Sequence, residues 1–208
     1  AARKCGLTPI VGCYISVRTS DSKGPARLLL LVQNTEGYLK LSRWLTRAYV
    51  GEEREMRAAI HSDWIKAEGS HGLIALSGWK DGDIERSLIH DDEEEATKKI
   101  KYWSNLFEGR FYLEIQRSNK AGNSILEASI LRLAEQERIP VVATHPVEFL
   151  APTEFMAHEA RYCIAEGLLL ADQNRPRLFN EEQYFKSQTQ MQELFSDLPG
   201  AIDNTIEI

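Results

Sequence analysis

Hydrophobic positions along the chain fall into short apolar runs, separated by longer segments in which apolar residues recur every three or four positions. The short runs are typical of buried strands, and they cover residues 9–17, 27–32, 72–78, 111–116 and 140–144. The longer segments predict amphipathic helices, which cover residues 38–49, 81–88, 93–107, 123–138, 152–166, 189–195 and 199–206. Because strands and helices alternate, the pattern predicts an α/β protein with a mainly parallel sheet.

Local signals place some of the helix ends and loops. The acidic run Asp91–Glu95 precedes several lysines and predicts the start of a helix, because carboxylates favour the positive end of the helix dipole. The alternative is an acidic docking surface. Thr153 is a candidate N-cap, and Gly167 is a candidate helix end. Polar composition predicts loops over residues 19–25 and 51–57, while residues 58–66 are too short a stretch to assign.

Composition and charge exclude several classes of protein. The chain has 208 residues, 43% hydrophobic and 9% aromatic, which excludes a disordered chain. No apolar run approaches the roughly 20 residues of a membrane helix. The first residues contain no secretory signal core, and we expect a cytoplasmic protein. The formal charge of −6 disfavours a domain that binds DNA mainly through contacts to its phosphates. Cys5, Cys13 and Cys163 show no metal-type spacing and are expected to be reduced thiols.

Motifs for catalysis or ligand binding are scarce. The five histidines form no H-x-H or H-E-x-x-H pattern, and the chain has no Gly-rich phosphate loop or G-x-S-x-G elbow. His145 follows a predicted strand, and sites in α/β folds gather at the carboxyl ends of strands. With Glu148 it could bind a metal; a surface or hydrogen-bonded histidine is the alternative. Asp81, Asp83 and Glu85 are interpreted as a helix N-terminus rather than as paired catalytic acids.

Several sequence blocks together resemble one family. They run in order through nearly the whole chain: Gly6–Cys13, Leu28–Asn34, Gly72–Gly78, Phe111–Gln116, Pro140–Thr144, Ala157–Arg161, Glu182–Ser187, Glu193–Pro199 and Asn204–Ile208. The blocks resemble the PHP (polymerase and histidinol phosphatase) domain of the alpha subunit of bacterial DNA polymerase III, a replicative polymerase of the C family. By this resemblance, residues 1–208 are a single PHP domain fragment. Its first metal motifs would lie upstream, and its polymerase domains would lie downstream.

The resemblance implies an incomplete, distorted barrel of the (β/α)7 type. In active members of the family, a cleft at the carboxyl ends of the strands holds zinc or manganese, which activates water for phosphoester hydrolysis. Five positions fall where the family places cleft residues and depart from its pattern: Tyr14, Arg27, Ser118, His145 and Glu148. Tyr14 replaces an acidic residue, and Arg27 replaces a histidine. Bulk and positive charge there predict a degenerate cleft without a metal, a cofactor or a catalytic residue.

Three functions are left open. The first is a non-catalytic structural and docking domain of a replicative DNA polymerase, a nucleotidyltransferase whose polymerisation step uses Mg²⁺ outside this chain. Its partners would be the rest of the alpha subunit and the proofreading exonuclease subunit, with DNA bound only through the parent protein. The second is a metal-dependent phosphoesterase or 3′–5′ exonuclease of the PHP type, with zinc or manganese near His145 and Glu148. The third is a stand-alone binding protein unrelated to replication.

Overall fold

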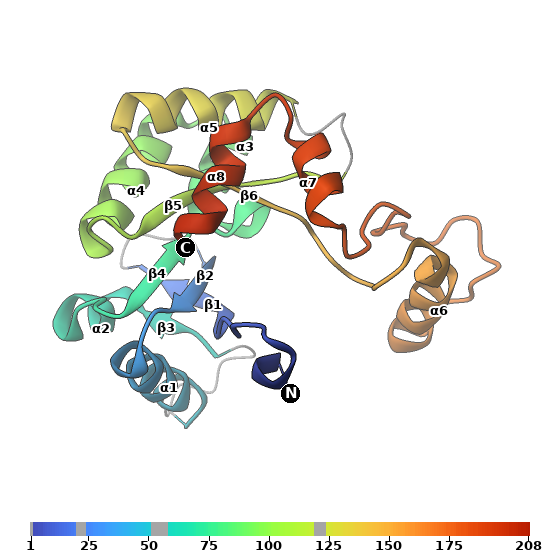
Figure 1. Cartoon of the computed structure of the whole chain (residues 1–208), viewed down its shortest axis with the longest axis horizontal. Helices are drawn as coiled ribbons and strands as arrows, with labels where there is room; N and C mark the ends of the chain where they lie inside the picture. Colours follow the sequence, from blue (N-terminus) through green and yellow to red (C-terminus); the bar gives the residue numbers. More distant parts are fainter. Residues whose placement is uncertain (1, 20–23, 51–57, 119–123) are drawn as a thin grey trace. The chain divides into compact units, whose positions relative to one another are not determined.

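The computed structural model describes residues 2–19, 24–50, 58–118 and 124–208. Figure 1 traces the chain from its N-terminus to its C-terminus. The chain divides into two compact units. Unit 1 comprises Ala1–Glu114, Ile125–Val141 and Ile208, and unit 2 comprises Ile115–Ser124 and Val142–Glu207. None of the described helices has the length and apolar character that a membrane crossing requires.

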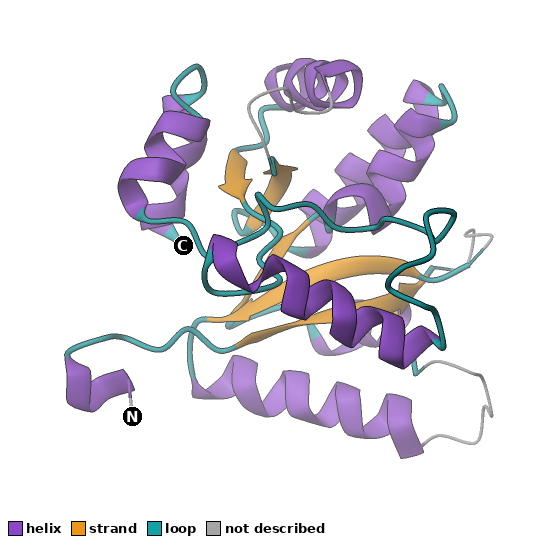
Figure 2. Cartoon of the chain, turned by 90° about the vertical axis from the view of Figure 1, so that its right-hand side faces the viewer, coloured by secondary structure: helices purple, strands orange, loops and turns teal. Residues whose placement is uncertain are grey.

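Among the described residues, six strands form one mixed sheet, drawn in orange in Figure 2: β1 (Gly12–Arg18), β2 (Ala26–Val32), β3 (Ile60–His61), β4 (Leu73–Leu76), β5 (Phe111–Gln116) and β6 (Val141–Thr144). Their order is β3-β1-β2-β4-β5-β6. β1 is parallel to β3 and β4 is parallel to β5, whereas β2 is antiparallel to both β1 and β4. The prediction of a mainly parallel sheet is therefore wrong around β2. The connection between β1 and β2 is too short for the crossover that a parallel pair requires.

The helices of unit 1 are α1 (Thr35–Val50), α2 (Ser62–Glu68), α3 (Asp83–Ile89), α4 (Glu93–Leu106) and, apart from its first residue, α5 (Ser124–Glu137), with the 3₁₀ turns η1 (Ala2–Cys5) and η2 (Trp79–Asp81). α1 packs against β2 and β3 and buries Leu41 and Trp44, while α3 packs against α4. The acidic run starts α4 as predicted, because the Asp92 side chain accepts the N–H of Glu95 at 3.0 Å.

Unit 2 contains the 3₁₀ turn η3 (Pro152–Glu154) and the helices α6 (Phe155–Glu166), α7 (Gln188–Leu194) and α8 (Pro199–Glu207). α7 contacts α8, and α6 contacts η3. Gly167 ends α6 as predicted, in the left-handed conformation with φ 67°. The prediction of Thr153 as the N-cap is wrong. Instead, the Glu154 carboxylate accepts the N–H groups of Leu150 and Ala151, at 2.9 and 3.2 Å.

Most predicted elements lie within a few residues of the observed ones. The strand expected at 9–17 begins at Gly12, and the helix expected at 81–88 is divided between η2 and α3. The unassigned stretch 58–66 contains β3 and the start of α2. The loops expected at 19–25 and 51–57 fall largely outside the described residues, because they include residues 20–23 and all of 51–57.

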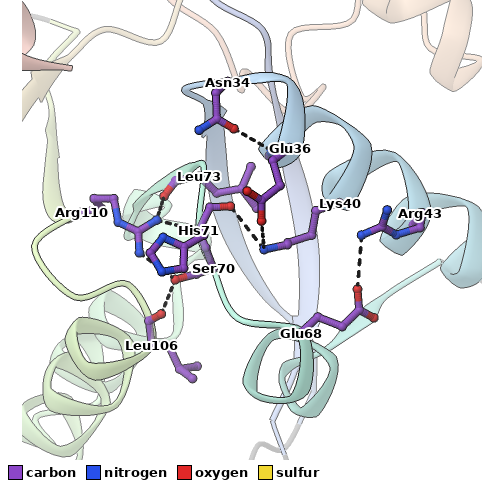
Figure 3. A network of polar contacts seen from close by, with 11 residues as sticks. Asn34, Glu36, Lys40, Arg43, Glu68, Ser70, His71, Leu73, Leu106 and Arg110 are labelled. Carbon is purple, nitrogen blue, oxygen red and sulfur yellow. Dashed lines mark hydrogen bonds and ion pairs between the residues drawn. The ribbon is translucent and has the colours of Figure 1, made fainter.

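The N-terminus of α1 is held against the turn that precedes β4 (Figure 3). Asn34 Oδ1 accepts the N–H of Gly37 at 2.9 Å, and the buried Lys40 donates to the carbonyl oxygen of His71 at 3.3 Å. A Cβ built on Gly37 would lie 1.9 Å from the carbonyl oxygen of Gly72. This close approach requires glycine at position 37, because any side chain would push α1 away from the turn.

Arg110 ties the same turn to the start of β5 (Figure 3). Its Nη1 donates to the carbonyl oxygens of Ser70 and Leu73 at 2.7 and 3.1 Å, and its Nη2 donates to Ser70 Oγ at 3.2 Å. The turn is therefore bonded on both sides, to α1 and to the residue that leads into β5.

Candidate functional site

Tyr14 and Arg27, two of the predicted cleft positions, lie together on the β1–β2 pair of unit 1. Tyr14 faces Leu29 and Ser16 faces Arg27, so Tyr14 and Arg27 are diagonal neighbours on one face of the sheet. The guanidinium carbon of Arg27 lies 3.7 Å from the centroid of the Tyr14 ring, which is a cation–π contact. Arg27 Nη1 also donates to Asp81 Oδ2 at 2.8 Å. The charge of Arg27 is therefore held between an aromatic face and a carboxylate.

This group of side chains is open to solvent on one side. The side chains of Arg27 and Asp81 are 41% and 67% exposed, and Tyr14 is 46% exposed. Partial burial raises the pKa of Tyr14; the charge of Glu114 acts in the same direction, and Arg27 acts in the opposite direction. Tyr14 is therefore a neutral phenol at neutral pH, and it offers a hydroxyl group rather than a carboxylate.

Two fully buried glutamates surround Ser77, just after β4. The Ser77 hydroxyl donates to Glu85 on α3, and the N–H of Glu114 on β5 donates to Ser77 Oγ at 3.0 Å. Burial raises the pKa of Glu85 to about 8 against the opposing effect of the Ser77 hydrogen bond, and the charges of Glu114 and Asp83 add to the increase. Glu85 is therefore mostly protonated in the folded protein at neutral pH.

Asp83 connects the start of α3 to α4. Trp103 Nε1 donates to both carboxylate oxygens of Asp83, at 3.0 and 3.1 Å, and burial raises the pKa of this carboxyl despite the hydrogen bonds. The interpretation of Asp81, Asp83 and Glu85 as a helix start is confirmed, since they lie in η2 and in the first turn of α3. Their local sequence gave no indication that Asp83 and Glu85 are buried.

His145, in unit 2, is oriented by a hydrogen bond to the backbone. Its Nδ1 lies 2.7 Å from the carbonyl oxygen of Arg117, and Nδ1 must donate because a carbonyl only accepts. In the neutral ring this leaves Nε2 unprotonated, and Nε2 is buried without a hydrogen-bond partner. A histidine held in this way presents a lone pair that could bind a metal ion.

Ser118 and Glu148 do not complete a metal site with His145. Ser118 follows Arg117, whose carbonyl binds the His145 ring, whereas Glu148 is exposed and its N–H donates to the Gln183 carbonyl oxygen at 2.8 Å. No group of three or more His, Cys, Asp or Glu side chains in the described part of the chain is placed to hold a metal ion. Tyr14 and Arg27 belong to unit 1, and Ser118, His145 and Glu148 belong to unit 2.

Arg117 organises the polar contacts of unit 2 near His145. Its buried guanidinium donates to Asp197 Oδ1 and Oδ2, at 2.6 and 2.9 Å, and to the Leu194 carbonyl oxygen at 2.9 Å. Hydrogen bonding from Arg117 holds the pKa of Asp197 below its usual value. Arg117 thus connects the residue after β5 to the end of α7 and to the loop before α8.

Sequence reasoning missed Glu114, Arg117 and the burial of Glu85. Glu114 carried a usable signal, because it lies inside the apolar run 111–116, where an acidic residue requires a specific partner if the strand is buried. Arg117 and Asp197 are 80 positions apart, and no local pattern relates them.

Comparison with known proteins gives a family and a set of relatives. The sequence model of the PHP domain matches residues 1–118. The DNA polymerase III subunit alpha of Pseudomonas aeruginosa is 39% identical over 208 residues, and that of Neisseria meningitidis serogroup A is 39% identical over 212 residues. The Escherichia coli subunit is 35% identical over 210 residues. Each alignment covers 100% of this chain and 18% of the relative, so the chain spans less than a fifth of the length of these relatives.

Proposed function

Because the chain belongs to the PHP domain family, we propose that it is the PHP region of a bacterial replicative DNA polymerase and serves there as a non-catalytic structural and docking domain. Identity of 34–39% to DNA polymerase III alpha subunits, over nearly the whole chain, supports the polymerase assignment. The proposal includes a cytoplasmic location and a distorted barrel of the (β/α)7 type, to which this sheet contributes. Polymerisation and its Mg²⁺ would belong to the rest of the polypeptide.

The observation that carries the non-catalytic proposal is the Arg27 guanidinium, which lies over Tyr14 and is paired with Asp81. The positive charge of Arg27 repels a cation, by about 4 kcal/mol for two unit charges 4 Å apart near a protein surface, and the Asp81 carboxylate offsets part of this repulsion. The nearby carboxylate of Asp81 already accepts a hydrogen bond from Arg27, and Tyr14 is a neutral phenol. These residues therefore do not fit a metal ion at a position where the family resemblance implies ligands.

The proposed partners are the rest of the polymerase polypeptide and the proofreading exonuclease subunit. The net charge of −6 supports DNA contact through the rest of the polypeptide rather than through this chain, because phosphate binding requires a basic surface. Size-exclusion chromatography of the complete polypeptide with the proofreading subunit of the same organism tests that partner. We expect one peak that contains both proteins, and separate elution would remove the proofreading subunit from the proposal.

A metal-dependent phosphoesterase, or a 3′–5′ exonuclease of the PHP type, is the second candidate. His145 favours it, because its backbone hydrogen bond leaves a buried Nε2 with no partner. Zinc or manganese bound there would activate water for attack on a phosphoester. Against it, the expected companion Glu148 is exposed and its backbone is bonded to Gln183.

Two assays on the complete polypeptide that carries this chain separate the candidates. Primer extension with Mg²⁺ tests the polymerase assignment, and hydrolysis of bis-p-nitrophenyl phosphate with added Zn²⁺ or Mn²⁺ tests the phosphoesterase. We expect primer extension, and hydrolysis no faster than that of a His145→Ala variant. Hydrolysis that is lost in His145→Ala but kept in His90→Ala, a control at an exposed histidine, would overturn the non-catalytic role. Absence of primer extension would overturn the polymerase assignment.

A further inference from the structure

Helix α6 of unit 2 presents an apolar side to solvent. Met156 and Ile164, which are 60% and 82% exposed, lie about two turns apart on one side of the helix, with Ala160 between them. Leu169, just beyond the helix end, is 76% exposed. Met156, Ala160 and Ile164, which carry no charge, form what we call the α6 face, and the exposed Arg161 borders it.

The opposite side of α6 is anchored in unit 2. His158 is buried, and its ring lies edge-on to Phe179 with 4.4 Å between the ring centroids. Glu159 forms an ion pair with Arg175, and the two side chains are only 3% and 6% exposed. Turning the helix inward would break this buried pair and leave uncompensated charges, which is strongly unfavourable. The inner side of α6 therefore sets its orientation, and the α6 face must point outward.

Large apolar side chains that are exposed close together indicate a surface that packs against another protein segment. The same stretch of unit 2 has further apolar residues that are more than 40% exposed: Val147, Leu150, Leu170, Leu178 and Phe185. Permanent contacts are more apolar than contacts that form and dissociate, so these exposed side chains favour a permanent contact.

Two findings indicate what covers the α6 face. The PHP domain match ends at residue 118, whereas the alpha subunits align with the whole chain, so α6 belongs to a part that this chain shares with alpha subunits beyond that match. The aligned region is 18% of the length of those relatives, which leaves a large remainder to pack on it. Resting on the proposed function, we infer that the α6 face packs against the remainder of the same polymerase polypeptide.

Thiol accessibility in the complete polypeptide tests whether the α6 face is covered. Ile164→Cys is compared with Glu94→Cys, a control on α4 where the native side chain is 82% exposed. Labelling by a maleimide is followed at each position by mass spectrometry of the peptides. We expect Ile164→Cys to label at least about tenfold more slowly than Glu94→Cys in the native protein, and the two rates to converge in urea. Equal rates in the native protein would overturn the inference.

Photo-crosslinking identifies the polypeptide segment that contacts the α6 face. The crosslinking amino acid p-benzoylphenylalanine replaces Met156, at the edge of the α6 face, in the complete polypeptide. We expect adducts with peptides of the same polypeptide outside these 208 residues, in a yield that does not depend on protein concentration. Adducts within these residues, adducts with a second copy that increase with concentration, or adducts that require an added subunit would each overturn the inference.

Primer extension by the same preparation separates the two proposals. If the polypeptide extends primers while Ile164→Cys and Glu94→Cys label equally fast, the inference on the α6 face fails and the proposed function stands. If it extends no primer, the proposed function fails whatever the labelling shows.

Discussion

Arg117 and Asp197 share two hydrogen bonds, although the side chain of Arg117 is 7% exposed and that of Asp197 is 67% exposed. One charge of the pair is in the interior of unit 2, and the other is on its surface. Removal of Asp197 therefore has a different consequence from removal of Arg117. Without Asp197, a buried guanidinium loses its counterion. Without Arg117, a carboxylate remains in water, and the Leu194 carbonyl oxygen loses one hydrogen-bond donor.

We expect the two substitutions to have unequal effects on stability. Asp197→Ala should lower the free energy of unfolding by about 1–3 kcal/mol. Arg117→Met should lower it by less, because it leaves no buried charge and keeps much of the packing of the side chain. Urea-induced unfolding measures both. Asp203→Ala, at an exposed position of α8, is the control and should change stability by less than about 0.5 kcal/mol. A larger loss for Arg117→Met than for Asp197→Ala would contradict this account.

The raised pKa of Glu85 predicts a dependence of stability on pH. The folded protein releases the Glu85 proton near pH 8, whereas an unfolded glutamate releases it near pH 4.5. Between these values the folded state holds more protons than the unfolded state. The free energy of unfolding therefore falls as the pH rises through this window, by up to about 1.4 kcal/mol per pH unit, and the fall ends above pH 8.

Glu85→Gln should remove this contribution, because glutamine does not ionise but can still accept the Ser77 hydrogen bond. We expect the stability of the variant relative to the native chain to increase steadily between about pH 5 and pH 8. Denaturant unfolding at intervals across this range measures the difference. Glu94→Gln, at an 82% exposed side chain, is the control, and its free energy of unfolding should change with pH in the same way as that of the native chain. If the stability of Glu85→Gln also changes with pH as that of the native chain does, Glu85 does not titrate in this window.

Gly72→Ala and Gly69→Ala form a matched pair, because both glycines have positive φ, of 78° and 70°. A Cβ on Gly72 would lie 2.4 Å from Asn34 Oδ1 and 2.7 Å from the Gly37 nitrogen, whereas no described atom lies within 4 Å of a Cβ on Gly69. The first substitution therefore adds a collision with the start of α1 to the strain of the left-handed backbone.

We expect Gly69→Ala to lower the free energy of unfolding by about 1–3 kcal/mol, because φ 70° with ψ 161° is a backbone conformation that essentially only glycine adopts. Gly72→Ala should lower it by about 1–3 kcal/mol more, since the side chain that caps α1 must move. Thermal or urea unfolding of the two variants provides the comparison. Equal losses would show that the turn moves away from α1 without resistance.

The sequence by itself determined the succession of strands and helices, the start of α4 at the acidic run 91–95 and the end of α6 at Gly167. It also carried the family resemblance, which the comparisons confirm. These features can be predicted because each depends on residues within a few positions of one another: apolar periodicity reports which face of an element is buried, and a cap bonds to its own helix. The degenerate character of the cleft stays a prediction that rests on residue types.

Tertiary structure alone decided the rest. The antiparallel pairing of β2 with β4, the position of Arg27 over Tyr14, the burial of Glu85 and the pairing of Arg117 with Asp197 were decided in this way. Each of them depends on contacts between different elements of the fold. The physical reason is that strand direction, cross-strand contacts and the burial of a charge are set by what packs against a segment, and a segment's own sequence does not specify its neighbour.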